Sequence, residues 1–115
     1  NLGNALSAER KIEEAITHYK MAIELKPGYS EAHHNLGNVL FNAKMTEEAI
    51  SHYKMAIELK PGYAEAHNNL GNALVQKGEV KEAVHYYRET VRLRPDLVVA
   101  RDNLETALLR SEELE

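Results

Sequence analysis

Apolar side chains recur along this chain at spacings of three and four residues, with polar side chains between them. Such spacing marks one face of an α-helix, and a central segment shows it clearly: Ala32, Leu36, Val39 and Leu40. After a short interruption a second run follows the same rule: Ala49, Ile50, Tyr53, Ala56 and Ile57. No segment alternates apolar and polar residues as a half-buried strand does. The pattern therefore predicts pairs of helices joined by short turns.

This pattern returns at a fixed interval of 34 residues, from residue 1 to residue 35 and from 35 to 69. The tetrapeptide Asn-Leu-Gly-Asn occupies residues 1–4, 35–38 and 69–72, and a weaker copy begins at Asn103. A fixed period of this size indicates stacked copies of one supersecondary unit, none of which buries its apolar face alone. A surface repeated along the stack is then a better candidate for function than any single residue.

Residues that favour helix ends divide each repeat in two. In the second repeat we expect Thr46 to cap the second helix, which ends at Lys60 before Pro61. Gly37 lies inside the first helix, where glycine costs about 1 kcal/mol relative to alanine. We therefore expect a neighbouring helix to approach this glycine closely.

The turn between the two helices of a repeat varies from copy to copy. The third repeat has Gly78-Glu79, an ordinary glycine stop. The first two repeats have Arg10-Lys11 and Lys44-Met45 instead. We expect these two turns to close on a residue other than glycine, with a modest loss of stability.

Composition and charge limit the classes of function. The chain has 115 residues, a net charge of −4 and no cysteine. This charge provides no basic surface for nucleic acid, and no apolar run approaches the roughly 20 residues that a membrane span needs. The lack of cysteine excludes disulfides and thiolate metal sites and fits a reducing compartment, so we expect a cytoplasmic protein.

The repeated residues resemble the signature of the tetratricopeptide repeat family. The second copy carries His33, Leu36, Gly37, Leu40, Ala49, Tyr53, Ala56 and Pro61, and the third carries His67, Leu70, Gly71, Leu74, Ala83, Tyr87, Thr90 and Pro95. The first copy begins at Leu2 and Gly3. The chain departs from the family signature in having histidine in place of the first aromatic residue and Thr90 in place of alanine. The resemblance implies an all-α fold, a right-handed α-solenoid of antiparallel helix pairs.

The resemblance also implies one domain over residues 1–115, with repeats at about 1–29, 30–63 and 64–97. A final helix at about 98–114 is expected either to cap the stack or to mark a cut through a longer array, since residue 1 falls within a repeat. The run from His18 to Tyr29 recurs unchanged as His52 to Tyr63. Such identity is typical of a recent duplication or of a consensus-guided design.

In this family the first helix of each pair lines a concave groove. The resemblance implies a peptide-binding groove formed by thirteen residues: Asn4, Glu31, His34, Asn35, Asn38, Phe41, Asn42, Glu65, Asn68, Asn69, Asn72, Val75 and Gln76. Its asparagines form two columns, which is similar to the asparagine ladder in the repeat domain of O-GlcNAc transferase. An amide offers both an acceptor and donors, so each asparagine is expected to pair with the C=O and N–H of an extended peptide.

Two alternatives bear on this ladder. The asparagines could instead bond to the adjacent helix and set the spacing between repeats. A clamp for a C-terminal carboxylate, as in co-chaperones of the family, is not expected, because the positions that would need lysine or arginine hold Glu65 and Asn69, or Val99 and Asn103.

The six histidines and the carboxylates of this chain do not form the pattern of a metal site or of an enzyme active site. His33 and His34 are adjacent and diverge around a helix, while His18 and His52 lie one full period apart, so no metal site is expected. His33 and His67 are expected to be packed in the core and to make the fold less stable in mild acid. No nucleophile motif or phosphate loop is present, so neither enzymatic activity nor a cofactor is expected.

The sequence therefore favours a non-enzymatic scaffold that holds an extended peptide or a helix of a partner protein in its groove. Two alternatives stay open. The exposed ends of the stack could associate end to end and form a homo-oligomer. The repeats could also be a structural spacer within a larger protein such as a glycosyltransferase.

Overall fold

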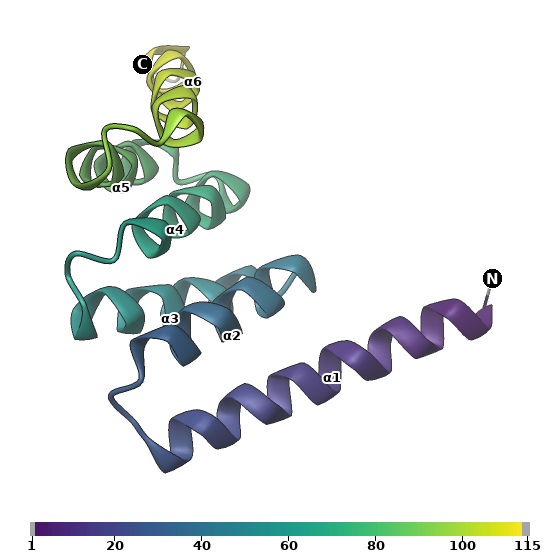
Figure 1. Ribbon diagram of the computed structural model, residues 1–115. Coiled ribbons are helices and arrows are strands. Elements are labelled where there is room, and N and C mark those ends of the chain that lie inside the picture. Colours follow the sequence, from purple (N-terminus) through teal and green to yellow (C-terminus); the bar gives the residue numbers. More distant parts are fainter. Residues whose placement is uncertain (1, 114–115) are drawn as a thin grey trace.

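The computed structural model describes residues 2–113, with side chains from residue 7 onward. Within this range the chain forms six helices and no strand: α1 (Leu2–Leu25), α2 (Ser30–Asn42), α3 (Thr46–Leu59), α4 (Ala64–Lys77), α5 (Val80–Leu93) and α6 (Val98–Glu113). Each helix packs mainly on the next one in the chain, and α2 also touches α4. Figure 1 shows the resulting stack, in which α2–α3 and α4–α5 are hairpins and α6 closes one end. The expected all-α solenoid is confirmed.

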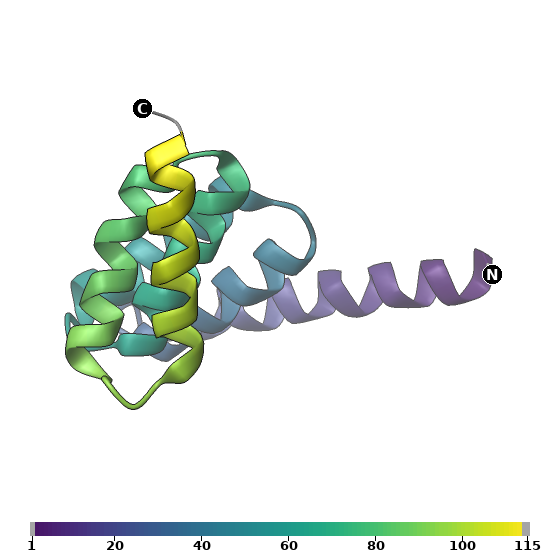
Figure 2. The ribbon, with the colours of Figure 1, turned by 90° about the horizontal axis from the view of Figure 1, so that it is seen from above.

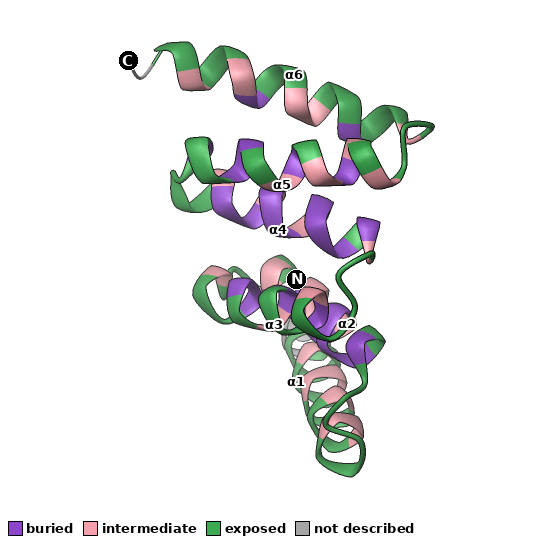
Figure 3. Cartoon of the chain, turned by 90° about the vertical axis from the view of Figure 1, so that its left-hand side faces the viewer, coloured by how far each residue is buried: buried purple, intermediate pink, exposed green. Residues whose placement is uncertain are grey.

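The core lies between successive helices and is built from the residues that the apolar spacing predicts. Leu36, Leu40, Leu70 and Leu74 are buried, together with Ala49, Tyr53 and Ala56 of α3 and with Ala83 and Tyr87 of α5. Figure 3 shows this buried surface concentrated on α2 to α5, whereas residues 7–25 of α1 are half-buried or exposed. Helix pairs inside the stack are therefore covered on both sides.

Two glycines allow the helices of a pair to meet closely. A Cβ added to Gly37 would lie 2.7 Å from the Cε1 of Tyr53, and one added to Gly71 would lie 2.6 Å from the Cε1 of Tyr87. Any side chain at these positions would overlap the tyrosine ring. The expectation that Gly37 serves close packing is confirmed.

The turns inside the two hairpins use a left-handed residue at the same position of the repeat. Lys44 has φ 67° and Gly78 has φ 95°. The left-handed conformation is unfavourable for a residue with a Cβ, so the hairpin at Lys44 carries the strain expected for a non-glycine turn. The expectation for Thr46 was wrong: Met45 is the N-cap, and Thr46 begins the helix and donates to Gln76 Oε1 at 3.3 Å.

The expected turn at Arg10-Lys11 is absent, because α1 runs without interruption from Leu2 to Leu25. Figures 1 and 2 show its N-terminal half projecting from the stack. The left-handed conformation that a turn would need at Arg10 is unfavourable for a residue with a Cβ. The continuous helix instead satisfies the backbone hydrogen bonds through the segment.

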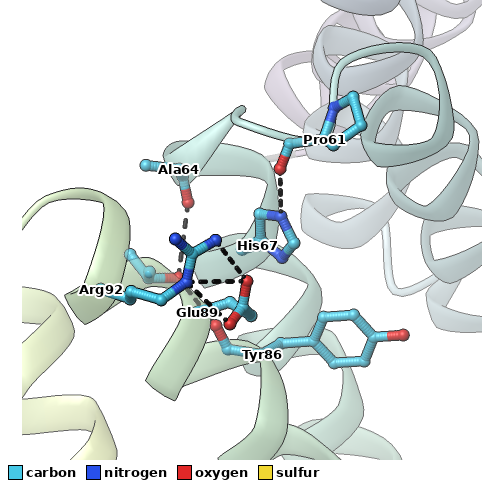
Figure 4. Close-up of polar contacts among 7 residues, drawn as sticks. Pro61, Ala64, His67, Tyr86, Glu89 and Arg92 are labelled. Atoms are coloured by element: carbon cyan, nitrogen blue, oxygen red, sulfur yellow. Dashed lines mark hydrogen bonds and ion pairs between the residues drawn. The ribbon is translucent and has the colours of Figure 1, made fainter.

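Two polar residues buried in the third repeat, His67 and Thr90, have backbone partners. His67 donates through Nε2–H to the carbonyl oxygen of Pro61 at 2.9 Å, and Thr90 donates to that of Tyr86 at 2.9 Å. Figure 4 shows His67, Pro61 and Tyr86 together with the ion pair of Glu89 and Arg92. The hydroxyl of Thr90 is thus satisfied at the position where the repeat pattern favours alanine.

Candidate functional site

Two hollows lie one repeat apart along α2, α4 and α6. The first has a volume of about 420 Å³ and is lined by Asn38, Phe41, Asn42, Tyr53, Asn69 and Asn72. The second has a volume of about 220 Å³ and is lined by Asn72, Val75, Tyr87, Asn103, Thr106, Ala107 and Arg110. Five lining residues of the first hollow have counterparts 34 positions later in the second. The hollows are therefore two copies of one subsite, which we call the amide subsites, and they share Asn72.

The asparagine of each amide subsite is held in one orientation. Tyr53 donates its hydroxyl hydrogen to Asn38 Oδ1 at 2.6 Å, and Asn69 Nδ2 donates to the same oxygen at 3.1 Å. In the next subsite Tyr87 donates to Asn72 Oδ1 at 2.6 Å. The tyrosines thus fix each amide with its oxygen toward the protein, which leaves the Nδ2 donors of Asn38 and Asn72 to face the hollow. An amide held in this way offers its Nδ2 donors, rather than its oxygen, to a ligand.

The second asparagine column links neighbouring repeats. Asn69 Nδ2 lies 2.9 Å from His34 Nε2, and Asn103 Nδ2 donates to Asn68 Oδ1 at 3.1 Å. His34 and Asn68 occupy the same position of consecutive repeats, so an imidazole nitrogen and an amide oxygen serve as equivalent acceptors. Asn35, in the same column, is half-buried and is not among the described residues that line either hollow.

The remaining groove residues of the sequence analysis lie at the edges of this surface. Glu31 is 4.0 Å from Lys60 Nζ, and Glu65 is 3.2 Å from Arg94 Nη1, so both carboxylates have exposed cationic neighbours. Gln76 accepts from Thr46 instead of lining a hollow. The side chain of Asn4 lies outside the described residues.

Sequence reasoning missed three contributors to the amide subsites. The repeating tyrosines, assigned to packing alone, also present their hydroxyls to the hollows, and burial raises the pKa of both Tyr53 and Tyr87, the latter to about 12. Arg110 supplies a cation to the second hollow. Its charge lowers the pKa of Tyr87 and so opposes the larger effect of burial. Arg110 occupies the same repeat position as Asn42 and Gln76. This position was the one feature of the sequence that could have identified Arg110 as a groove residue.

The histidines form contacts that spacing alone does not reveal. His33 Nδ1 and His52 Nδ1 are 3.1 Å apart, so one of them carries the shared hydrogen. Within residues 7–113, no three histidine, aspartate or glutamate side chains gather where an ion could be held. None of the described helices combines the length and apolar character needed to cross a membrane.

We expect the stability of the fold to fall as the pH drops below the ordinary histidine value of 6.5. Burial lowers the pKa of His34, and burial together with His33 and Lys20 lowers that of His52. In this window the unfolded chain binds more protons than the folded chain, so the free energy of unfolding decreases as the pH falls. Protonated His34 would also place an Nε2–H against the Asn69 amide donor. Urea titrations from pH 7.5 to pH 5 would measure the slope.

His34→Asn is the matched control for this titration. The third repeat already carries Asn68 at that position with the equivalent bond, so the variant should fold and show a shallower pH dependence. An unchanged slope would mean that His34 does not contribute.

Comparison with known proteins identifies the repeat. The sequence model described as TPR repeat matches residues 3–43 and 46–78, and the one described as Tetratricopeptide repeat matches residues 64–97. No curated protein matches the chain.

Two solved structures share the arrangement of helices. The first TPR of Spaghetti (RPAP3) bound to the HSP90 peptide SRMEEVD has a TM-score of 0.86 and 24% identity, covering 96% of this chain and 87% of that one. The MamA protein has a TM-score of 0.80 and 28% identity over 84% of this chain. This chain spans 52% of the MamA chain.

Proposed function

The chain belongs to the tetratricopeptide repeat family, and we propose that it is a protein-interaction scaffold whose amide subsites hold an extended segment of a partner protein by its backbone. The family assignment supports the scaffold. The fixed orientation of Asn38 and Asn72 supports the kind of ligand, because two oriented amide donors one repeat apart match the carbonyl oxygens of an extended chain. This orientation is the observation that carries the proposal.

The charges around the subsites support one direction for the partner segment. No charged side chain is among the described residues that line the first hollow, whereas Arg110 lines the second. Glu31 and Glu65 are not among the described residues that line either hollow, and they lie beside Lys60 and Arg94. A segment that places an acidic residue or a C-terminal carboxylate beside Arg110 therefore fits better than one with its acid at the α2 end.

A two-carboxylate clamp is not part of this proposal, because Arg110 is the one cation among the described lining residues. The peptide SRMEEVD, which is bound in the structure of the RPAP3 repeat, is thus a useful probe that we expect to bind weakly. We further propose that the chain acts in the cytoplasm and without catalysis.

The experiment is a peptide array followed by fluorescence anisotropy on the selected peptides. Asn38→Asp combined with Asn72→Asp keeps the oxygen that accepts from each tyrosine and removes the donors. With each hydrogen bond contributing about 0.5–1.5 kcal/mol, the double variant should bind about tenfold more weakly or worse. Asn38→Ala with Asn72→Ala should also weaken binding. Equal affinity of the double variants and the parent chain would refute the donor reading.

Ser51→Asp combined with His85→Asp is the control for the added charge. These two exposed residues lie on α3 and α5, one repeat apart, and line neither hollow among the described residues. This control should bind the selected peptides like the parent chain. A loss equal to that of the asparagine variants would point to net charge as the cause.

End-to-end association has one structural argument against it. In end-to-end association, α6 would pack against the second half of α1 of another copy, as the two helices of a repeat do. Such a pair needs a glycine at the repeat position of Gly37 and Gly71. Helix α6 has Glu105 at this position. A Cβ at this position overlaps the tyrosine ring in both complete pairs. We therefore favour binding by the groove over stacking of the ends.

A further inference from the structure

Polar side chains at the first amide subsite and its border form one continuous row of hydrogen bonds, which we call the amide row: Tyr63, His34, Asn69, Asn38 and Tyr53. The Tyr63 hydroxyl lies 2.9 Å from His34 Nδ1, and Asn69 Nδ2 lies 2.9 Å from His34 Nε2. The same Nδ2 donates to Asn38 Oδ1 at 3.1 Å, and the Tyr53 hydroxyl donates to that oxygen at 2.6 Å. The direction of each bond in the row is therefore tied to the direction of its neighbours.

His34 controls these directions because the Nδ2 of Asn69 is a donor and cannot accept. His34 Nε2 must therefore be the acceptor nitrogen of a neutral imidazole, and its Nδ1–H donates to the Tyr63 oxygen. A proton added to His34 would go to Nε2, where it would face the Asn69 donor. An imidazolium has no acceptor, so this bond cannot persist in its present direction.

We propose that His34 is a positioning residue of the first amide subsite, and that its protonation turns over Asn69 and Asn38 so that the subsite presents an acceptor. Each bond of the amide row can be made in reverse. Asn69 Oδ1 would accept from His34 Nε2–H and from Asn38 Nδ2. Asn38 Nδ2 would also donate to the oxygen of Tyr53, whose own hydrogen would then turn to the hollow that Tyr53 lines. Asn38 Oδ1 would face the hollow in place of Nδ2.

The consequence for a ligand rests on the proposed function of the groove. A backbone carbonyl that accepts from Asn38 Nδ2 would meet Asn38 Oδ1 after the inversion, and two acceptors do not bond. The first subsite would thus hold the carbonyl of a partner segment at neutral pH and release it in mild acid.

The groups around His34 set the pH range of this change. Burial lowers the pKa of His34, and the carboxylates of Glu65 and Glu31 oppose this effect. The rings of Tyr63 and Tyr53 also face it, with centroids at 4.8 Å and 5.9 Å, and the described part of α1 contributes no group. Burial raises the pKa of both tyrosines, so they stay neutral here. We therefore expect the inversion below the ordinary histidine value of 6.5.

The second amide subsite has an equivalent row with an amide in place of the imidazole. Asn103 Nδ2 donates to Asn68 Oδ1 at 3.1 Å and to Asn72 Oδ1 at 3.5 Å, and Tyr87 donates to Asn72 Oδ1 at 2.6 Å. An amide oxygen gains no proton in this pH range. The first subsite should therefore respond to pH, whereas the second should not.

The first test uses NMR on the free protein between pH 7.5 and pH 5.5. At pH 7.5, a long-range proton–nitrogen correlation should show the His34 hydrogen on Nδ1. In acid, the Asn69 amide hydrogens should lose their Overhauser contacts to His34, and those of Asn38 should gain contacts to the Tyr53 ring, with the midpoint of the His34 titration. A hydrogen on Nε2 at pH 7.5, or amide contacts that do not follow His34, would refute the inversion.

Three variants separate the inversion from a general effect of acid. His34→Asn gives the first row the composition of the second and should abolish the response. Leu97 occupies the repeat position of the tyrosine that bonds to His34, so Asn68→His combined with Leu97→Tyr should transfer the response to Asn72. The matched control His85→Asn removes an exposed histidine and should respond like the parent chain. A response that survives His34→Asn would refute the role of His34.

Fluorescence anisotropy with array-selected peptides that lack histidine forms the second arm, with circular dichroism to check the fold at each pH. The parent chain should bind about three- to tenfold more weakly at pH 5.5 than at pH 7.5, which corresponds to one lost hydrogen bond. His34→Asn should remove this difference and keep the affinity at pH 7.5. Inverted amide contacts without any change in affinity would refute the contact of Asn38 with the ligand and leave the inversion intact.

Discussion

Gly71→Val should destabilise the fold by about 3 kcal/mol, near the upper end for an overpacked core and a large part of the 5–15 kcal/mol typical of a whole domain. The Cβ alone would lie 2.6 Å from Cε1 and 2.8 Å from Cδ1 of Tyr87. The ring has little freedom to retreat, because Tyr87 is 3% exposed and its hydroxyl is bonded to Asn72 at 2.6 Å. Urea denaturation followed by helical circular dichroism would measure the loss.

Gly62→Val is the matched control, since nothing lies within 4 Å of a Cβ added there. It should change the stability by no more than about 0.5 kcal/mol. Tyr87→Ala combined with Gly71→Val should cost less than the sum of the two single changes, because the two residues compete for one space. Additive losses, or a harmless Gly71→Val, would contradict the close approach of α4 and α5.

Tyr53→Ala should cost about 4 kcal/mol, whereas Tyr19→Ala should cost about 1 kcal/mol, although both tyrosines lie in the same local sequence. Tyr53 is 1% exposed, packs against Gly37 and donates to Asn38. Tyr19, on α1, is half-buried. The comparison therefore separates the contribution of the covering helix from that of local sequence. Thermal and urea unfolding of both variants at low micromolar concentration would measure it. Equal costs of Tyr19→Ala and Tyr53→Ala in the parent chain would contradict the difference in coverage.

The candidate site was only partly accessible to sequence reasoning. The family resemblance predicted Asn38, Asn72, Phe41 and Val75 as groove residues, and all four line one of the two hollows. The direction of each amide was not accessible, because it depends on a tyrosine hydroxyl 15 residues further along the chain. Arg110 was missed for a similar reason, since the second hollow exists only where α6 packs beside α4 and α5.

Periodic spacing, Gly37 and Gly71, and the closing prolines suffice to define the helices and their stacking, because these features act within one repeat and between neighbours alike. These sequence features do not decide whether the two helices of a given repeat form a hairpin or one continuous helix. The same twelve residues, His18–Tyr29 and His52–Tyr63, end an open helix in one case and a packed hairpin in the other. The outcome depends on whether contacts with the preceding helix outweigh a left-handed residue at the turn, and this balance is a property of the assembled fold.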